Sequence, residues 1–169
     1  IATTETVTEL ATLNADGGTN ALTIVIRGLD AIAPTAAQLN TINDATSVAV
    51  DLTNVTALAA SSLSDLGTLA TDINASEFSN ATGLTTIAVS GATIEADALA
   101  SIIDSYDSIH ENNTTDMTLA SGAKINVAST EITALLDDEA DGRVTIVDQD
   151  INVDSGDISV DTANDLDLT

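Results

Sequence analysis

Ile87-Ala88-Val89-Ser90-Gly91-Ala92-Thr93-Ile94 is the stretch that decides the fold, because the spacing of its apolar residues recurs along the chain. Two apolar residues stand two positions apart, and a third follows after four intervening residues. β-branched residues alternating in this way predict a strand followed by a turn. The five copies are Ile24, Ile26 and Ala31; Val48, Val50 and Val55; Ile87, Val89 and Ile94; Met117, Leu119 and Ile125, with one extra residue; and Val144, Ile146 and Ile151.

A segment with helical periodicity precedes each copy. Two apolar residues three positions apart place both side chains on one helix face. Ser61-Ser62 and Ser129-Thr130 have the residue types that cap helix starts, and Gly142 is a residue type that ends helices. We therefore expect five short helices, carrying the pairs Val7 and Leu10, Leu39 and Ile42, Leu63 and Leu66, Leu99 and Ile102, and Ile132 and Leu135.

A helix and a strand repeated down a chain indicate units that stack on one another. We expect an α/β solenoid with a parallel β-sheet on one face and short helices on the other, residues 1–169 forming a single repeat array. A parallel β-helix is the alternative. The long stretches 70–84 and 106–116 are expected to be loops at one edge. The expected rungs are 5–32, 35–57, 60–94, 95–127 and 129–153, with 154–169 as an acidic continuation or the start of a next rung.

Aligning the copies by their apolar residues also predicts the register between strands. In this register each basic residue falls one rung from an aspartate. Exposed ion pairs contribute only about 0–1 kcal/mol, so their value is as markers of the register. The predicted neighbours are Arg27 and Asp51, Asp116 and Arg143, and Lys124 and Asp150; the equivalent second apolar residues are Ile26, Val50, Val89, Leu119 and Ile146.

Composition excludes several classes of function. The net charge of −24, from 27 acidic and three basic residues, disfavours binding to nucleic acid or to an anionic membrane surface. Phe78 and Tyr106 are the only aromatic residues, so the core must be aliphatic and no stacking platform for sugars or bases is expected. The absence of cysteine excludes disulfides and thiolate metal sites.

Catalytic chemistry has little support in this sequence. His110 is the only histidine. Ser101 and Asp104 lie near it in sequence, but no spacing indicates a nucleophile with an oriented base. We therefore expect no enzyme, no catalytic residues and no required cofactor.

Calcium is the one metal that the residue types allow, because carboxylate and amide oxygens are its ligands. Asp148, Asp150 and Asn152 resemble the opening of an EF-hand loop, but Val153 stands where that loop needs glycine and Ser159 where it needs glutamate. A solvated acidic face is the alternative interpretation. The candidate calcium ligands are Asp137, Asp138, Asp141, Asp148 and Asp150.

The segments Thr35–Ser47 and Leu84–Gly91 resemble repeats in very large cyanobacterial and other marine bacterial surface proteins. The strand-and-turn spacing is also similar to that of leucine-rich repeats, although the asparagine of their turns is missing. The resemblance to surface proteins implies a secreted or cell-surface structural or adhesive role, often beside calcium-binding modules. It supplies no catalytic residues.

These observations predict an extracellular structural or adhesive module of a bacterial surface, filament or fibre protein. Its expected partners are neighbouring copies or further repeats of the same protein. The alternative is a β-helix domain that binds or hydrolyses polysaccharide, with possible calcium dependence, so carbohydrate remains a candidate partner. Asn-x-Ser/Thr sequons also occur, for which chance in a chain rich in these residues is the simplest interpretation; they begin at Asn54, Asn74, Asn80, Asn112 and Asn113.

Overall fold

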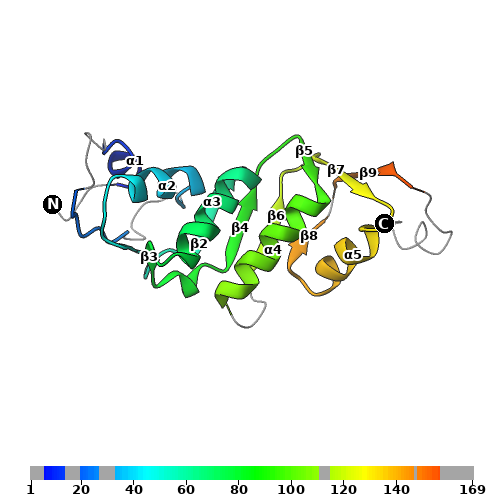
Figure 1. Cartoon of the computed structure of the whole chain (residues 1–169). Helices are drawn as coiled ribbons and strands as arrows, with labels where there is room; N and C mark the ends of the chain where they lie inside the picture. Colours follow the sequence, from blue (N-terminus) through cyan, green and yellow to red (C-terminus); the bar gives the residue numbers. More distant parts are fainter. Residues whose placement is uncertain (1–5, 14–19, 27–32, 111–114, 147, 157–169) are drawn as a thin grey trace.

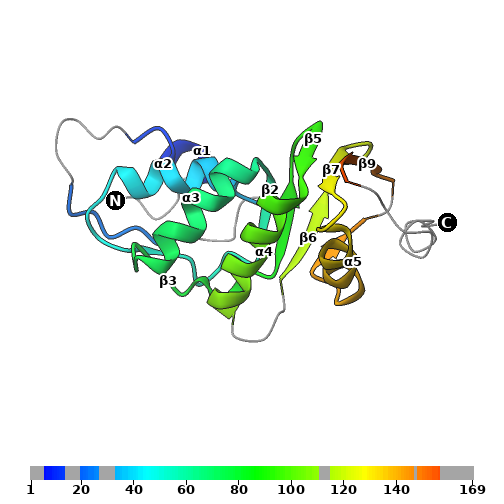
Figure 2. The same ribbon diagram turned by 45° about the vertical axis from the view of Figure 1, so that its right-hand side comes forward.

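The computed structural model describes residues 6–13, 20–26, 33–110, 115–146 and 148–156. In this part the chain is a mixed α/β protein whose sheets are parallel. Figures 1 and 2 show the helices following one another along the long axis of the molecule in chain order, with the strands beside them.

Five α-helices form where the apolar pairs predict them. Consecutive helices pack on each other, α1 on α2, α2 on α3, α3 on α4 and α4 on α5. Most of the paired residues are buried, as an amphipathic helix requires. The helices are α1 (Val7–Leu10), α2 (Ala36–Asp44), α3 (Leu63–Asn74), α4 (Ala96–His110) and α5 (Ile132–Ala140).

Local sequence fixes where several helices begin and end. Capping boxes start α1 at Thr6 and α2 at Thr35, and the Ser62 hydroxyl accepts a hydrogen bond from the Asp65 N–H at the start of α3. Each such cap contributes about 1 kcal/mol. After α5, Gly142 has a φ of 73°, a left-handed conformation that suits glycine. The predicted cap at Ser62 and stop at Gly142 are confirmed, whereas α5 begins after Glu131 without a side-chain cap.

Three parallel sheets run beside the helices. Their strand orders are β1-β3, β2-β4-β6-β8 and β5-β7-β9, so each strand pairs with one from the next unit along the chain. A single turn of 3₁₀ helix, η1 (Ala81–Gly83), separates β3 from β4. The strands are β1 (Val50–Asp51), β2 (Ala57–Ser61), β3 (Phe78–Ser79), β4 (Thr86–Val89), β5 (Thr93–Glu95), β6 (Asp116–Leu119), β7 (Lys124–Ala128), β8 (Val144–Thr145) and β9 (Asp150–Ser155).

The predicted register is confirmed from β4 onward. Ile87 pairs with Met117 and Met117 with Val144, while Ile94 pairs with Ile125 and Ile125 with Ile151. A slip of one residue would turn these apolar side chains from the core to the solvent, which is why the apolar spacing specifies the pairing.

The predicted register is wrong before β4. Val50 pairs with Phe78 rather than with Val89, and the partner of Ile87 is Leu58. The reason is an additional strand: the stretch 70–84, expected to be a loop, contains the end of α3, β3 and η1. Strand β3 takes the place beside β1, so β4 pairs with β2 instead.

The charged markers of the register give a mixed outcome. Lys124 and Asp150 are register partners, as predicted. The Met117 N–H donates to the Arg143 carbonyl, so the strand alignment there holds, but the Arg143 side chain pairs with other aspartates described below. Arg27 lies outside the described residues, and the partner that Asp51 has in this region is Val25.

The core lies between the helices and the sheets and is almost entirely aliphatic. Leu39, Leu66, Ile87 and Leu99 are fully buried. Tyr106 is also fully buried; its hydroxyl donates a 3.4 Å hydrogen bond to the Leu66 carbonyl, and burial raises its pKa far above the usual range. Small and branched side chains suit an interior this thin, as the composition predicts.

Candidate functional site

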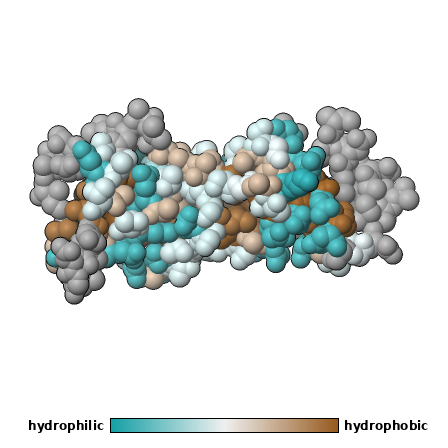
Figure 3. All heavy atoms as spheres, turned by 90° about the horizontal axis from the view of Figure 1, so that it is seen from above, coloured by the Kyte–Doolittle hydropathy of each residue, from teal (hydrophilic) through white to brown (hydrophobic). Residues whose placement is uncertain are grey.

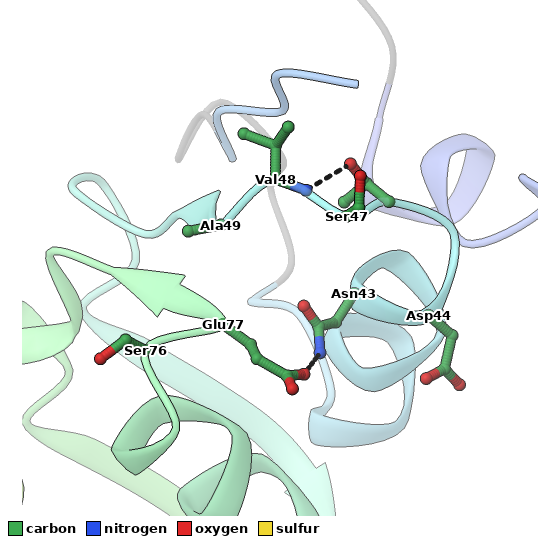
Figure 4. Close-up of a pocket in the computed structure, with 8 residues that line it drawn as sticks. Asn43, Asp44, Ser47, Val48, Ala49, Ser76 and Glu77 are labelled. Carbon is green, nitrogen blue, oxygen red and sulfur yellow. Dashed lines mark hydrogen bonds between the residues drawn. The ribbon is translucent and has the colours of Figure 1, made fainter. Parts of the chain in front are cut away.

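One polar pocket of about 360 Å³ lies where the C-terminal end of α2 faces the turn before β3. Figure 4 shows its walls, formed by the end of α2, the segment that leads into β1, and the residues just before β3. Six of its eight lining residues carry hydroxyl, amide or carboxylate side chains. The lining residues are Asn43, Asp44, Thr46, Ser47, Val48, Ala49, Ser76 and Glu77.

The wall that leads into β1 is held by a buried threonine. The Thr46 hydroxyl donates to the Leu22 carbonyl at 2.8 Å and accepts from the N–H groups of Leu22 and Val48 at 3.1 Å. A buried hydroxyl with all of these partners is satisfied and fixes the backbone on both sides. The pocket therefore has one wall tied to the N-terminal segment 20–26.

The opposite wall is the turn between α3 and β3. The Glu77 N–H donates to the Asp72 carbonyl and the Glu77 carbonyl accepts from the Val50 N–H, so the turn is tied to α3 and to β1. Ser76 has a φ of 65°, a left-handed conformation that is uncommon for a residue other than glycine. This turn brings Glu77 to face the end of α2.

Carboxylates dominate the electrostatics of the pocket. The buried Asn43 amide donates to Glu77 Oε2 at 2.6 Å. Behind it, burial raises the pKa of Asp72, and the nearby Glu77 and Asp44 carboxylates raise it further. The lining residues include no basic side chain, so the pocket presents hydroxyl, amide and carboxylate groups to a ligand.

The histidine weighed for catalysis lies elsewhere, at the C-terminal end of α4. His110 is buried, and its Nε2 atom makes no hydrogen bond within the described part of the chain. Within the described residues, His110 Nε2 therefore makes no hydrogen bond to Ser101 or Asp104.

A second polar cluster surrounds Arg143 between α4 and α5. Its guanidinium bonds Asp107 of α4 at 2.9 Å, pairs closely with the buried Asp138 of α5, and lies 3.7 Å from Asp141. Burial raises the pKa of Asp138, Arg143 lowers it, and the neighbouring carboxylates raise it again. The cluster thus ties the last helix to the helix before it.

The structure divides the predicted calcium ligands between two places. Asp138 and Asp141 bind the Arg143 guanidinium, and Asp137 lies beside them in α5. Asp148 accepts a 2.5 Å hydrogen bond from the Ser121 hydroxyl, while Asp150 lies in β9. Within the described ranges, no three acidic or histidine side chains are arranged to hold a metal ion. A calcium site stays a prediction.

A ladder of polar side chains crosses the outer face of the sheet β5-β7-β9, and the sequence interpretation missed it. Asn126 donates to Glu95 at 2.9 Å, and Asn152 donates to Asn126 at 3.0 Å. Each of the three residues comes directly after the third apolar residue of a repeated strand-and-turn pattern. An alignment of the repeats that includes this next position places all three in one column. The comparison with leucine-rich repeats covers only the turn after the strand, where asparagine is missing.

The face of the molecule seen in Figure 3 is mixed in hydropathy. In the view of Figure 3, hydrophilic and neutral residues cover most of the described face, with smaller hydrophobic areas between them. Val25 is the exposed large hydrophobic side chain of the described part, at 42%. No described helix has the length and apolar character needed to cross a bilayer.

Comparison with known proteins identifies no relative. No protein family, no curated protein and no solved structure matches this chain.

Proposed function

We propose that the chain is an α/β solenoid of about five rungs that serves as a structural or adhesive module of an extracellular bacterial surface, filament or fibre protein. One observation carries the proposal: the helices, and the strands within each sheet, lie side by side in the order in which they occur along the chain. Helices pack in the order α1 to α5, and the strand orders β2-β4-β6-β8 and β5-β7-β9 follow the same direction. Units that contact only their neighbours make a quasi-one-dimensional scaffold.

The end of each sheet supports a role in a longer array. No other described strand pairs with the far side of β8 or β9. An edge strand offers backbone N–H and C=O groups to another strand, so further repeats or neighbouring copies are the natural partners. The acidic surface keeps such an array soluble and away from nucleic acid and anionic lipid.

The solenoid is tested by removing its last rung. Truncation after Ala128 deletes α5, β8 and β9, whose contacts in the described structure run to α4, β6 and β7. We expect the remaining units to stay folded with lower stability, measured by circular dichroism and by hydrogen exchange of α2 and α3. Loss of all protection in α2 and α3 would show one cooperative globule instead.

The location is tested with antibodies against the chain, applied to intact and to permeabilised cells of the source organism. The proposal expects equal labelling of both. Labelling that requires permeabilisation would contradict a cell-surface role, whatever the truncation experiment shows.

Polysaccharide binding is the second candidate, and the exposed ladder of Glu95, Asn126 and Asn152 favours it. Amide and carboxylate groups at the strand spacing offer a regular row of donors and acceptors. Affinity electrophoresis against neutral and acidic polysaccharides tests this idea, with Asn126→Ala expected to weaken any retardation. Thr118→Ala, on the exposed face of β6, is the matched control.

Calcium dependence is tested by thermal melting in calcium chloride and in EDTA. A ligand at about 100 times its dissociation constant stabilises the folded state by about 2.7 kcal/mol, which a melt resolves. Equal melting temperatures would leave the carboxylates of Asp148 and Asp150 as solvated surface.

A further inference from the structure

Three Asn-x-Ser/Thr sequons lie in the described part of the chain, and their surroundings differ. They begin at Asn54, Asn74 and Asn80. An N-glycan acceptor must lie on the surface and enter the binding groove of a transferase as an accessible tripeptide. The burial of each whole tripeptide therefore separates the three.

The sequons at Asn54 and Asn80 are fixed to the core. Their middle residues, Val55 and Ala81, are 3% and 6% exposed and belong to the hydrophobic core. The Asn54 amide donates to the Ile26 carbonyl at 3.4 Å and the Asn80 amide donates to Asp51 at 3.0 Å. A transferase would have to pull a core residue into solvent to use either one.

The sequon Asn74-Ala75-Ser76 is exposed along its whole length. It forms the end of α3 and the turn after it, where the Ala75 N–H donates to Thr71 and the Ser76 N–H to Ile73. No hydrogen bond of the Asn74 side chain occurs among the described residues. Ile73 in this last turn is only partly buried against the core, and helix ends open more readily than helix interiors.

We propose that Asn74 is the acceptor of an N-linked glycan from a lipid-linked oligosaccharide. In the transfer, Asn74 Nδ2 bonds to the anomeric carbon of the first sugar and loses one proton. The bond from that carbon to the lipid pyrophosphate breaks, and the pyrophosphate leaves with its electron pair. The Ser76 hydroxyl is the third member of the sequon that the transferase binds.

The proposal rests on the proposed extracellular location only in requiring that the chain be exported.

A glycan at Asn74 would lie beside the polar pocket. Ser76 and Glu77, which follow it, line that pocket and are labelled in Figure 4. The attached sugar would therefore be joined to the chain two residues before the pocket lining begins on this side.

The test uses the folded chain, a purified bacterial oligosaccharyl transferase and its lipid-linked oligosaccharide, with glycopeptides mapped by mass spectrometry. The background carries Asn112→Gln and Asn113→Gln, because both of these sequons begin within residues 111–114, which lie outside the described part. We expect one glycan per chain, on Asn74. Asn74→Gln and Ser76→Ala should reduce it to none, while Asn54→Gln should retain it.

Two results would overturn the proposal: no transfer to the folded chain, or transfer mapped to Asn54 or Asn80. Asn74 is exposed, so Asn74→Gln should keep the wild-type circular dichroism spectrum; Ser76 has a left-handed φ of 65°, so the spectrum of Ser76→Ala is the control for folding of the turn. The result is independent of the cell-labelling experiment, so failure of the proposed location and failure of the acceptor site are distinguishable.

Discussion

The N-terminal region, residues 20–79, and the C-terminal region, residues 86–155, both have a layer of helices beside short parallel strands. The two regions differ in the interactions that keep their strands aligned. In the C-terminal region four residues of β4 pair with β6 and five residues of β7 pair with β9. In the N-terminal region β1 and β3 share two pairs, and single bridges join Asn20 to Thr46 and Val25 to Asp51. Backbone ladders order one region, whereas isolated pairs need additional support in the other.

Polar side chains provide that support in the N-terminal region. Thr46 binds the segment 20–26, and Asp51 accepts from the Thr53 hydroxyl at 2.6 Å, from the Thr53 N–H and from Asn80. The C-terminal region instead has the Arg143 cluster at its helix junction. The difference teaches that short strands stay aligned when side chains satisfy the backbone groups that a longer ladder would pair.

Ile87→Ala should have the largest effect, because β4 pairs with β2 on one side and β6 on the other and joins the two regions. Ile87 is fully buried, and truncating such a side chain costs about 2–5 kcal/mol of unfolding free energy. Urea denaturation measures this loss, and hydrogen exchange should show it in both regions. Thr86→Ala, on the exposed face of β4, is the control, with a change within about 0.5 kcal/mol.

Arg143→Met should destabilise the C-terminal region alone. It leaves the buried Asp138 carboxylate without a cation, and breaking a buried pair costs about 3–5 kcal/mol, less here because the cluster is partly exposed. Hydrogen exchange should speed up in α5 and β8 and stay unchanged in α2. Adding Asp138→Asn should restore most of the loss; if it does not, the buried charge is not the cause.

Thr46→Val should loosen the N-terminal region in the same way. The Leu22 C=O would lose its hydroxyl partner, whereas the Leu22 N–H keeps the Asn20 carbonyl. Leaving a buried group unsatisfied costs about 1–3 kcal/mol, and less here because the bond is part-buried. Faster exchange at Leu22 and Val48, with no change in β7, is the expected pattern. Thr41→Val removes an exposed helical hydroxyl and serves as the control.

Mild acid should stabilise both helix junctions by a smaller amount. Burial raises the pKa of Asp72 at α2–α3 and of Asp138 at α4–α5 above the ordinary value of 3.8, so the folded state binds these protons more tightly than the unfolded state. Their contribution to stability is full below about pH 3.8 and is lost as the pH rises through each folded pKa. The melting temperature should therefore rise as the pH falls through the two folded pKa values toward 3.8.

Variants of the two aspartates test whether their carboxyl groups cause this rise in melting temperature. Asp72→Asn and Asp138→Asn should each flatten the rise, and a curve unchanged in both variants would refute the assignment. The pKa of Asp51 is shifted in the opposite direction, because hydrogen bonds from Thr53 and Asn80 lower it. The contribution of the Asp51 carboxylate to stability is present above pH 3.8 and is lost as the pH falls through the folded pKa. In Asp51→Asn, the melting temperature should therefore fall less steeply with pH below 3.8.

The sequence by itself determined the five helices, the aliphatic core and the register from β4 onward. Apolar residues at fixed spacing must face the interior, and in Ile87, Met117 and Val144 this requirement leaves one possible alignment. The same reasoning failed at Phe78-Ser79, because a strand of two residues carries no periodic signal. The apolar spacing therefore predicted Val89 as the partner of Val50, whereas the partner in the structure is Phe78 of β3.

Only the tertiary structure decided the polar sites. The pocket joins Asn43 to Glu77, 34 positions apart, and Arg143 reaches Asp107 on a neighbouring helix rather than Asp116 on the neighbouring strand. A long guanidinium side chain selects its partner by its direction and reach, which strand columns do not specify. Periodicity determined which residues face the core, whereas packing between helices decided which polar groups meet.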